Sequence, residues 1–148
     1  MPAPSLTSDG FLPPGVHDCS LDDIRAGFGG FQGSDQRPRL FNLLIELVKA
    51  MQRCGLFDAL LVDGSFVTDK PAPNDVDVVA VLRPGHDFER DLSAAEYALV
   101  SRTLLRRRFG FDVLLAERDS VLYETYVDFF SRVRERPDLR KGILRLRL

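Results

Sequence analysis

Apolar side chains recur at helical spacing in several segments of this chain, so that each segment would present one apolar face. The strongest pattern runs through Leu40, Leu44 and Met51, with Pro38 suited to the first helical turn and Gly55 to the helix end. Weaker patterns follow serines that can cap a helix. They predict helices over residues 20–29, 93–110 and 120–136.

Short apolar runs lie between these segments, and such runs are typical of buried strands. They cover residues 56–62, 75–82 and 111–116, and the second is rich in valine, which favours strands. Residues 142–148 alternate apolar and basic side chains, which predicts an edge strand or a docked tail. Together these segments predict an α/β (α+β) fold with a short mixed sheet and helices packed mainly on one face.

Length and composition fit a single folded domain. The chain has 148 residues, of which 45% are apolar and 28% are charged, as in ordinary globular proteins. Residues 1–12, rich in proline, serine and glycine, are expected to form an irregular arm, and residues 13–148 the domain itself.

The chain carries no sign of export or membrane insertion, so we expect a cytoplasmic protein that does not contact a membrane. No apolar run approaches the roughly 20 residues that cross a bilayer. Cys19 and Cys54 form no close-spaced pair, and only His17 and His86 could join them, so we expect reduced thiols rather than a zinc site. The net charge of -2 excludes a general basic field for nucleic acid, although residues 106–108 and the basic tail leave a local patch open.

Two acidic residues enter the second predicted strand. Asp75 and Asp77 are two apart, so their carboxylates project from the same face of a strand. Burying both anions would be costly unless a cation neutralised them. Mg²⁺, with Mn²⁺ as the alternative, suits carboxylate oxygens and keeps places for water and phosphates. Two such ions could stabilise the attacking and leaving oxygens of a phosphoryl transfer.

Gly64 and Ser65 follow the first predicted strand. A glycine at this position lets backbone N–H groups approach a phosphate closely, and a serine adds a hydroxyl donor. The Gly-Ser turn and the Asp-x-Asp pair are the two halves of one motif. Each half is common by itself, but the order of strand, Gly-Ser, turn and Asp-x-Asp strand is much more specific. An anion cradle and a cation site are therefore expected to face each other.

This order of features resembles the signature of the polymerase-β-like nucleotidyltransferase superfamily. An apolar strand is followed by Gly64-Ser65, then nine residues, then Asp75-Val76-Asp77 entering a valine-rich strand. Residues 12–17 and 63–68 are also similar to a family of small bacterial proteins placed in that superfamily. The resemblance implies a nucleotidyltransferase-like fold in which Gly64 and Ser65 contact a nucleoside triphosphate such as ATP. It also implies that Asp75 and Asp77 bind Mg²⁺ and that a third acid on a later strand helps to activate the attacking hydroxyl.

Asp112 is the candidate for that third acid, as metal ligand or general base, because it opens the strand after a predicted helix. The alternative is an ordinary charged residue at a strand edge, with Glu117 as the fallback for the catalytic role. Lys70 lies in the turn between the two motif halves and is a candidate for reaching the triphosphate. Asp63 replaces the apolar residue usual in the superfamily. It is expected either to contact the site residues without touching the ligand, or to pair with Lys70.

The expected activity is magnesium-dependent transfer of a nucleoside monophosphate from a nucleoside triphosphate to a hydroxyl on RNA, protein or a small molecule. Larger relatives select the base and the acceptor with an additional domain, which this chain lacks, so a partner protein is considered for the choice of acceptor. Two alternatives stay open. One is a non-catalytic nucleotide-binding or protein-interaction module, such as one half of a toxin-antitoxin-like pair, and the other is a metal-dependent nuclease.

Overall fold

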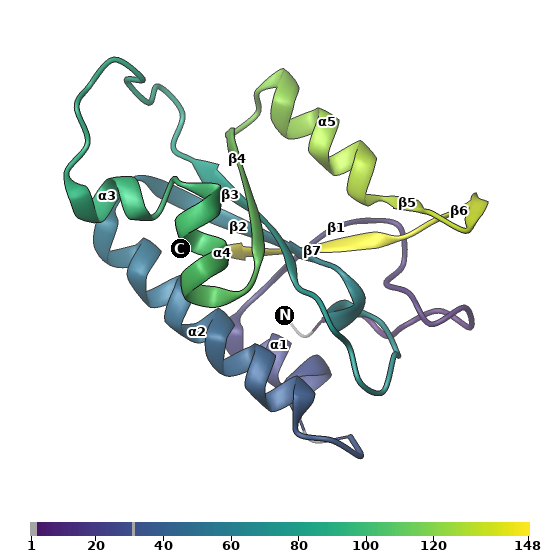
Figure 1. The fold of residues 1–148 in the computed structure, drawn as a ribbon. Coiled ribbons are helices and arrows are strands. Elements are labelled where there is room, and N and C mark those ends of the chain that lie inside the picture. Colours follow the sequence, from purple (N-terminus) through teal and green to yellow (C-terminus); the bar gives the residue numbers. More distant parts are fainter. Residues whose placement is uncertain (1–2, 31) are drawn as a thin grey trace.

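A computed structural model describes residues 3–30 and 32–148 and has a five-stranded mixed sheet at its centre (Figure 1). The strands in spatial order are β1 (Gly15–Cys19), β7 (Gly142–Arg147), β2 (Phe57–Asp63), β3 (Asp77–Leu82) and β4 (Asp112–Glu117). β2 is antiparallel to both β7 and β3, whereas β1 runs parallel to β7 and β4 runs parallel to β3. The predicted mixed sheet is therefore confirmed.

Three helices bury their apolar stripes against one face of this sheet. They are α1 (Leu21–Phe28), α2 (Gln36–Cys54) and α4 (Arg102–Phe109), and they form the main core with alternate residues of the strands. The Ser20 side chain caps α1, and Gly55 ends α2 in the left-handed conformation with a φ of 76°. The local signals for these two helices act as the sequence predicts.

The opposite face carries one helix, α5 (Val121–Phe130), which covers a smaller apolar cluster. Strand residues alternate between the two clusters, so that Leu60 belongs to the main core and its neighbour Leu61 to the cluster beneath α5. Figure 1 shows α2 and α5 on opposite sides of the sheet. The expectation that helices pack mainly on one face is confirmed.

The single helix predicted over residues 93–110 is wrong, because the chain forms two helices there. α3 (Ala94–Ala98) ends before Ser101, whose hydroxyl accepts a hydrogen bond from the N–H of Leu104 at 3.3 Å and so caps α4. Tyr97, which a single continuous helix would place on its apolar face, is 57% exposed. The second serine cap outweighs the continuous helical spacing.

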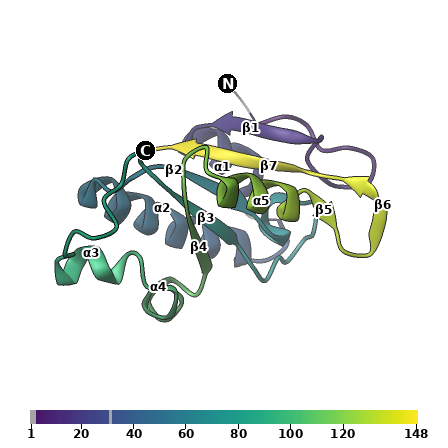
Figure 2. The same cartoon turned by 90° about the horizontal axis from the view of Figure 1, so that it is seen from above.

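The helix predicted over residues 120–136 is shorter than expected. It ends at Phe130, and a two-stranded hairpin follows, formed by β5 (Arg132–Val133) and β6 (Arg136–Arg140). The side chains of Arg132 and Arg140 both bind Asp128 of α5, at 2.6 and 3.3 Å, which ties the hairpin to the helix end. Figure 2, which turns the molecule, shows this hairpin projecting beyond the start of β7.

The expectation of an edge strand or docked tail at residues 142–148 is wrong, because β7 lies inside the sheet between β1 and β2. Its apolar residues Leu144 and Leu146 are buried in the main core, and its basic residues face the α5 side. The edge next to β7 is formed by β1, a strand that the sequence patterns did not predict, and the other edge by β4.

The arm before β1 has no helix or strand in residues 3–14, yet it packs on the domain. Leu12 is 1% exposed, and the N–H of Asp69 donates to the carbonyl oxygen of Gly10 at 3.1 Å. Within the described residues, no helix combines the length and the apolar composition needed to cross a membrane.

Candidate functional site

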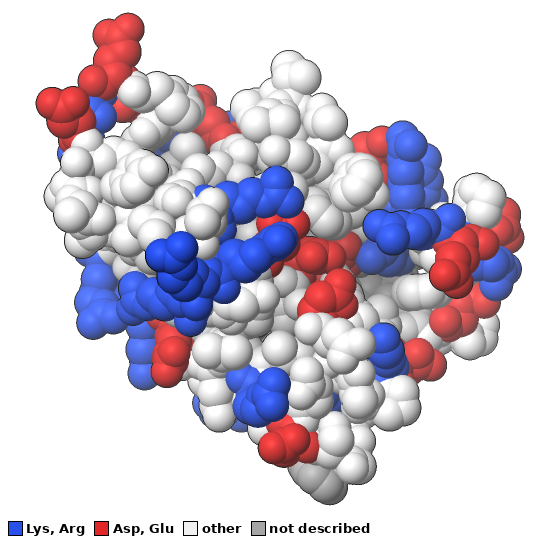
Figure 3. All heavy atoms as spheres, in the orientation of Figure 1, with Lys and Arg blue, Asp and Glu red and all other residues white. Residues whose placement is uncertain are grey.

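Three acidic residues lie in a row across the sheet, at the end where β2 finishes and where β3 and β4 begin. Asp63 is paired with Asp77 in antiparallel register, and Asp77 is paired with Asp112 in parallel register. Side chains of directly paired residues project to the same face, here the face that carries α5. Figure 3 shows acidic side chains gathered in the middle of one face of the molecule, with basic side chains on both sides.

Asp75, two residues before the start of β3, is fixed by the Gly-Ser turn. The backbone N–H of Ser65 donates to Asp75 Oδ1 at 3.0 Å, and the Ser65 hydroxyl donates to the same oxygen. The Ser65 hydroxyl oxygen also accepts from the N–H groups of Asn74 at 3.2 Å and Asp75 at 3.4 Å. Ser65 thereby joins the two halves of the sequence motif.

Gly64 adopts a conformation and a position that only glycine can take. Its φ is 88°, and a Cβ atom would lie 2.9 Å from the Asp75 carbonyl oxygen and 3.0 Å from the Asp77 nitrogen. The backbone of the turn can therefore approach the Asp-x-Asp segment closely, and it continues into a short 3₁₀ helix, η1 (Ser65–Val67).

A buried arginine that the sequence analysis missed holds the segment after η1. Arg37 of α2 is 1% exposed, and its guanidinium donates to four carbonyl oxygens, those of Phe28, Phe66, Thr68 and Lys70, at 2.6 to 3.3 Å. Arg37 lies three, four and seven residues before apolar positions of α2 that are buried, so its place on the apolar stripe was a usable signal.

Asp63, the first acid of the row, is paired with Lys141 and not with Lys70. Lys141 Nζ lies 3.0 and 2.9 Å from the two carboxylate oxygens, and the Asp63 side chain is only 4% exposed. Burial raises the pKa of Asp63 to about 6, and Lys141 opposes this change. No local pattern could have indicated the pair, because its members are 78 residues apart.

Asp77, the middle acid, has no basic partner in direct contact. In residues 3–30 and 32–148, its partly buried carboxylate makes no hydrogen bond or ion pair. Burial raises the pKa of Asp77, and the charges of Asp75 and Asp112 raise it further. This crowding of negative charge favours a cation at the site.

Asp112, the third acid, is bound by two arginines of α4. Arg102 makes a bidentate contact at 2.6 and 2.8 Å, and Arg106 Nη2 lies 3.2 Å from Oδ1. Hydrogen bonds from Arg102 lower the pKa of Asp112, which makes its carboxylate a weaker base. The basic run at residues 106–108 thus contributes one side chain to the acidic row.

A cavity of about 570 Å³ opens beside the row and collects most of the predicted site residues. One side is formed by Asp63, Gly64, Ser65, Asp75 and Asp77. Phe129 and Phe130 of α5, the β5–β6 turn and Lys141 form much of the rest. Four residues predicted from the motif therefore share one concave surface.

The other predicted site residues lie elsewhere. Asp112 neighbours Asp77 but does not line the cavity. Lys70 is exposed outside it, and its backbone carbonyl accepts from Arg37. The fallback Glu117 pairs with Leu82 at the opposite end of β4, so it is far from the acidic row.

The chain was also compared with known proteins. Residues 4–147 match DUF6932, a family of unknown function. The chain belongs to this family. No curated protein and no solved structure matches it.

The acidic end of the DUF6932 domain fits a divalent cation whose coordination shell is completed by a ligand. Among the described residues, no group of three or more histidine, cysteine, aspartate or glutamate side chains could hold a metal by itself. Mg²⁺, however, is commonly bound through one or two carboxylates together with substrate phosphates. Asp75 and Asp77 can provide those carboxylates, because within the described residues the contacts of Asp75 use only Oδ1 and the Asp77 carboxylate makes none.

Proposed function

We propose that this protein is a magnesium-dependent nucleotidyltransferase of the polymerase-β-like superfamily. It would move a nucleoside monophosphate from a nucleoside triphosphate to a hydroxyl on RNA, protein or a small molecule. The observation that carries the proposal is the cavity in which the unpartnered Asp77 and the anchored Asp75 face the same space as Gly64 and Ser65. The resemblance of residues 63–78 to the superfamily signature supports it.

Each residue of the motif has a place in such a reaction. Asp75 and Asp77 would hold Mg²⁺, or Mn²⁺ in its stead, and the bound ion would supply charge neutralisation for the triphosphate. Ser65 orients Asp75 through its amide and hydroxyl. Gly64, without a Cβ, keeps the turn close to the Asp-x-Asp backbone, so that the two halves form one surface.

The transfer is an in-line displacement. The acceptor hydroxyl oxygen attacks the α-phosphorus, the bond from that phosphorus to the bridging oxygen breaks, and pyrophosphate leaves with the electron pair. The hydroxyl proton passes to a carboxylate. Asp112 is the candidate proton acceptor. It can take the proton only after Arg102 and Arg106 release it, because both side chains bind its carboxylate oxygens.

Label transfer tests the proposal directly. Each α-³²P nucleoside triphosphate is incubated with the protein, Mg²⁺ and total RNA, total protein or a small-molecule extract, and the products are separated. We expect label on one acceptor class, release of pyrophosphate, and no transfer with the Asp77→Asn variant. Failure to label any acceptor with any of the nucleotides would refute the proposal, and shortening of the RNA would identify a nuclease instead.

A second candidate is a non-catalytic nucleotide-binding module on the same scaffold. The observation in its favour is the neutralisation of Asp112 by two arginines, which occupies the group expected to activate the acceptor. Magnesium-dependent nucleotide binding measured by calorimetry, without label transfer, would support this candidate over the enzyme.

A further inference from the structure

Lys141 and Asp63 form an ion pair at the cavity, and this ion pair has no part in the proposed transfer reaction. Lys141 Nζ contacts both carboxylate oxygens of Asp63, and the two side chains are 16% and 4% exposed. Both residues line the cavity that Asp75 and Asp77 also line. A nearly buried cation thus faces the same space as the candidate metal ligands.

Backbone contacts fix the position of Lys141 between β6 and β7. Its N–H donates to the carbonyl oxygen of Ser131 at 2.8 Å, and the N–H of Gly142 donates to that of Leu12 at 2.9 Å. A Cβ atom on Gly142 would lie 2.0 Å from the Pro13 carbonyl oxygen, so the chain passes here in close contact with the arm. An ammonium held in this way loses little conformational freedom when it binds a ligand.

The hydrogen-bonding capacity of Lys141 is not exhausted by Asp63. An ammonium has three N–H donors, and the two carboxylate oxygens account for two of them. One donor remains for a ligand that enters the cavity. Because Asp63 is buried, it restrains the lysine from swinging into solvent.

Arg134 places a second cation at the same cavity. It is an exposed residue of the turn between β5 and β6, and it lines the cavity together with Lys141. Its charge acts on Asp77, as does that of Lys141. The cavity therefore has acids on one side and cations on another, an arrangement suited to a polyanion that carries its own divalent ion.

We propose that Lys141, held in place by Asp63, binds the triphosphate tail of the nucleotide, and that Arg134 adds a second contact at the rim of the cavity. The identity of the ligand as a nucleotide rests on the proposed function, whereas polyphosphate binding does not. Lys141 thus has the role that was predicted for Lys70, which is contact with the triphosphate. Asp63 is a positioning residue, since it acts on the ligand through Lys141.

Calorimetry with inorganic tripolyphosphate and Mg²⁺ tests the binding step without any transfer. The main variant is the double substitution Asp63→Asn with Lys141→Gln, because removing Lys141 alone would leave Asp63 buried without a partner. We expect binding about tenfold weaker in the double variant and about threefold weaker in Arg134→Gln. The control is Arg39→Gln, which removes an exposed cation of α2 that does not line the cavity and should change affinity less than about twofold.

Two results would overturn the inference: no binding of tripolyphosphate by the wild-type protein, or wild-type affinity in a folded double variant. Should the double variant not fold, the wild-type protein gives the answer through amine acetylation followed by mass spectrometry. Tripolyphosphate should slow the acetylation of Lys141 and leave that of the exposed Lys70 unchanged. Equal rates at Lys141 with and without tripolyphosphate would contradict the assignment.

The label-transfer assay separates this inference from the proposed function. Binding of tripolyphosphate that the double variant loses, in a wild-type protein that transfers no label, supports the inference and refutes the transfer reaction. Transfer by the double variant with an unchanged KM for the nucleotide overturns the inference and supports the transfer reaction.

Discussion

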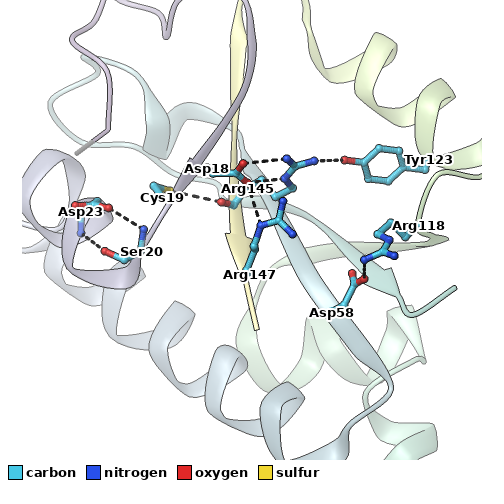
Figure 4. Close-up of polar contacts among 9 residues, drawn as sticks. All are labelled: Asp18, Cys19, Ser20, Asp23, Asp58, Arg118, Tyr123, Arg145 and Arg147. Atoms are coloured by element: carbon cyan, nitrogen blue, oxygen red, sulfur yellow. Dashed lines mark hydrogen bonds and ion pairs between the residues drawn. The ribbon is translucent and has the colours of Figure 1, made fainter. Parts of the chain in front are cut away.

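Both ends of the α5 face of the sheet carry ion pairs, but the acidic end also holds Asp77, a carboxylate that no described residue pairs with. At one end, shown in Figure 4, Arg145 binds both oxygens of Asp18 at 2.6 and 3.0 Å and donates to the Tyr123 hydroxyl at 3.3 Å. Arg118 binds Asp58 there at 2.9 Å. At the other end, Asp77 lies between Asp63 and Asp112, and among the described residues no basic group contacts its carboxylate.

The pKa directions express the same difference. Hydrogen bonds from Arg145 lower the pKa of Asp18, whereas burial and neighbouring acids raise the pKa of Asp77. Opposite charges in contact satisfy each other and need no ligand. Like charges that the fold keeps together cost stability, and such crowding is typical of sites that bind a cation or do chemistry.

Asp77→Asn should give the largest effect and separates activity from stability. Transfer should fall about a thousandfold, equivalent to about 4 kcal/mol, because an amide brings no charge to the candidate metal site. The free energy of unfolding should not fall, since the substitution removes repulsion from Asp75 and Asp112. Kinetics of label transfer and denaturant unfolding measure the two quantities. The control is Asp18→Asn at the paired end, which should keep its activity, and unchanged transfer in Asp77→Asn would disprove the assigned role.

Arg37→Leu tests how the acidic end is kept in place. We expect a loss of at least about 3 kcal/mol in the free energy of unfolding, because four carbonyl oxygens lose their donor. Urea unfolding followed by circular dichroism measures it. Arg39→Leu, an exposed position on the same helix, is the matched control and should change stability little. Equal stabilities for the two variants would contradict the role given to Arg37.

Asp63→Asn tests how the free energy of unfolding depends on pH through the acidic end of the sheet. The pKa of Asp63 is raised to about 6 by burial, so its stabilising contribution is present at low pH and is lost as the pH rises through that value. The stability difference between the wild type and Asp63→Asn should therefore be larger at about pH 5 than at about pH 8, by about 1.4 kcal/mol. Unfolding at several pH values measures this change. A difference that is constant with pH, or larger at high pH, would be incompatible with the raised pKa.

Arg145→Gln should give the smallest effect and the opposite dependence on pH. A loss of about 1 kcal/mol is expected at neutral pH, because the pair with Asp18 is partly exposed. The pKa of Asp18 is lowered, so the contribution of the pair is present above its unfolded pKa and disappears as the pH falls below it. Thermal unfolding measures the effect, and label transfer should stay as in the wild type. Loss of transfer in this variant would show that the paired end also serves the reaction.

Local sequence predicted the elements whose signals act over a few residues. The caps of α1 and α2 and the apolar runs of β2 and β3 each depend on neighbours along the chain, and these elements form near the expected positions. The same local reasoning failed over residues 93–110, where Ser93 and Ser101 each cap a separate helix. It also misplaced residues 142–148, because alternation shows that a strand has two faces but not how many neighbours it has.

The sequence by itself determined the Gly64-Ser65 turn and the spacing of Asp75 and Asp77, because a hairpin-like return of the chain keeps such close residues together. Only the tertiary structure decided which cations meet the acids. Lys141 reaches Asp63, and Arg102 reaches Asp112, through strand order and helix placement. Such partners are chosen by burial and register between distant segments, which no local pattern of residues encodes.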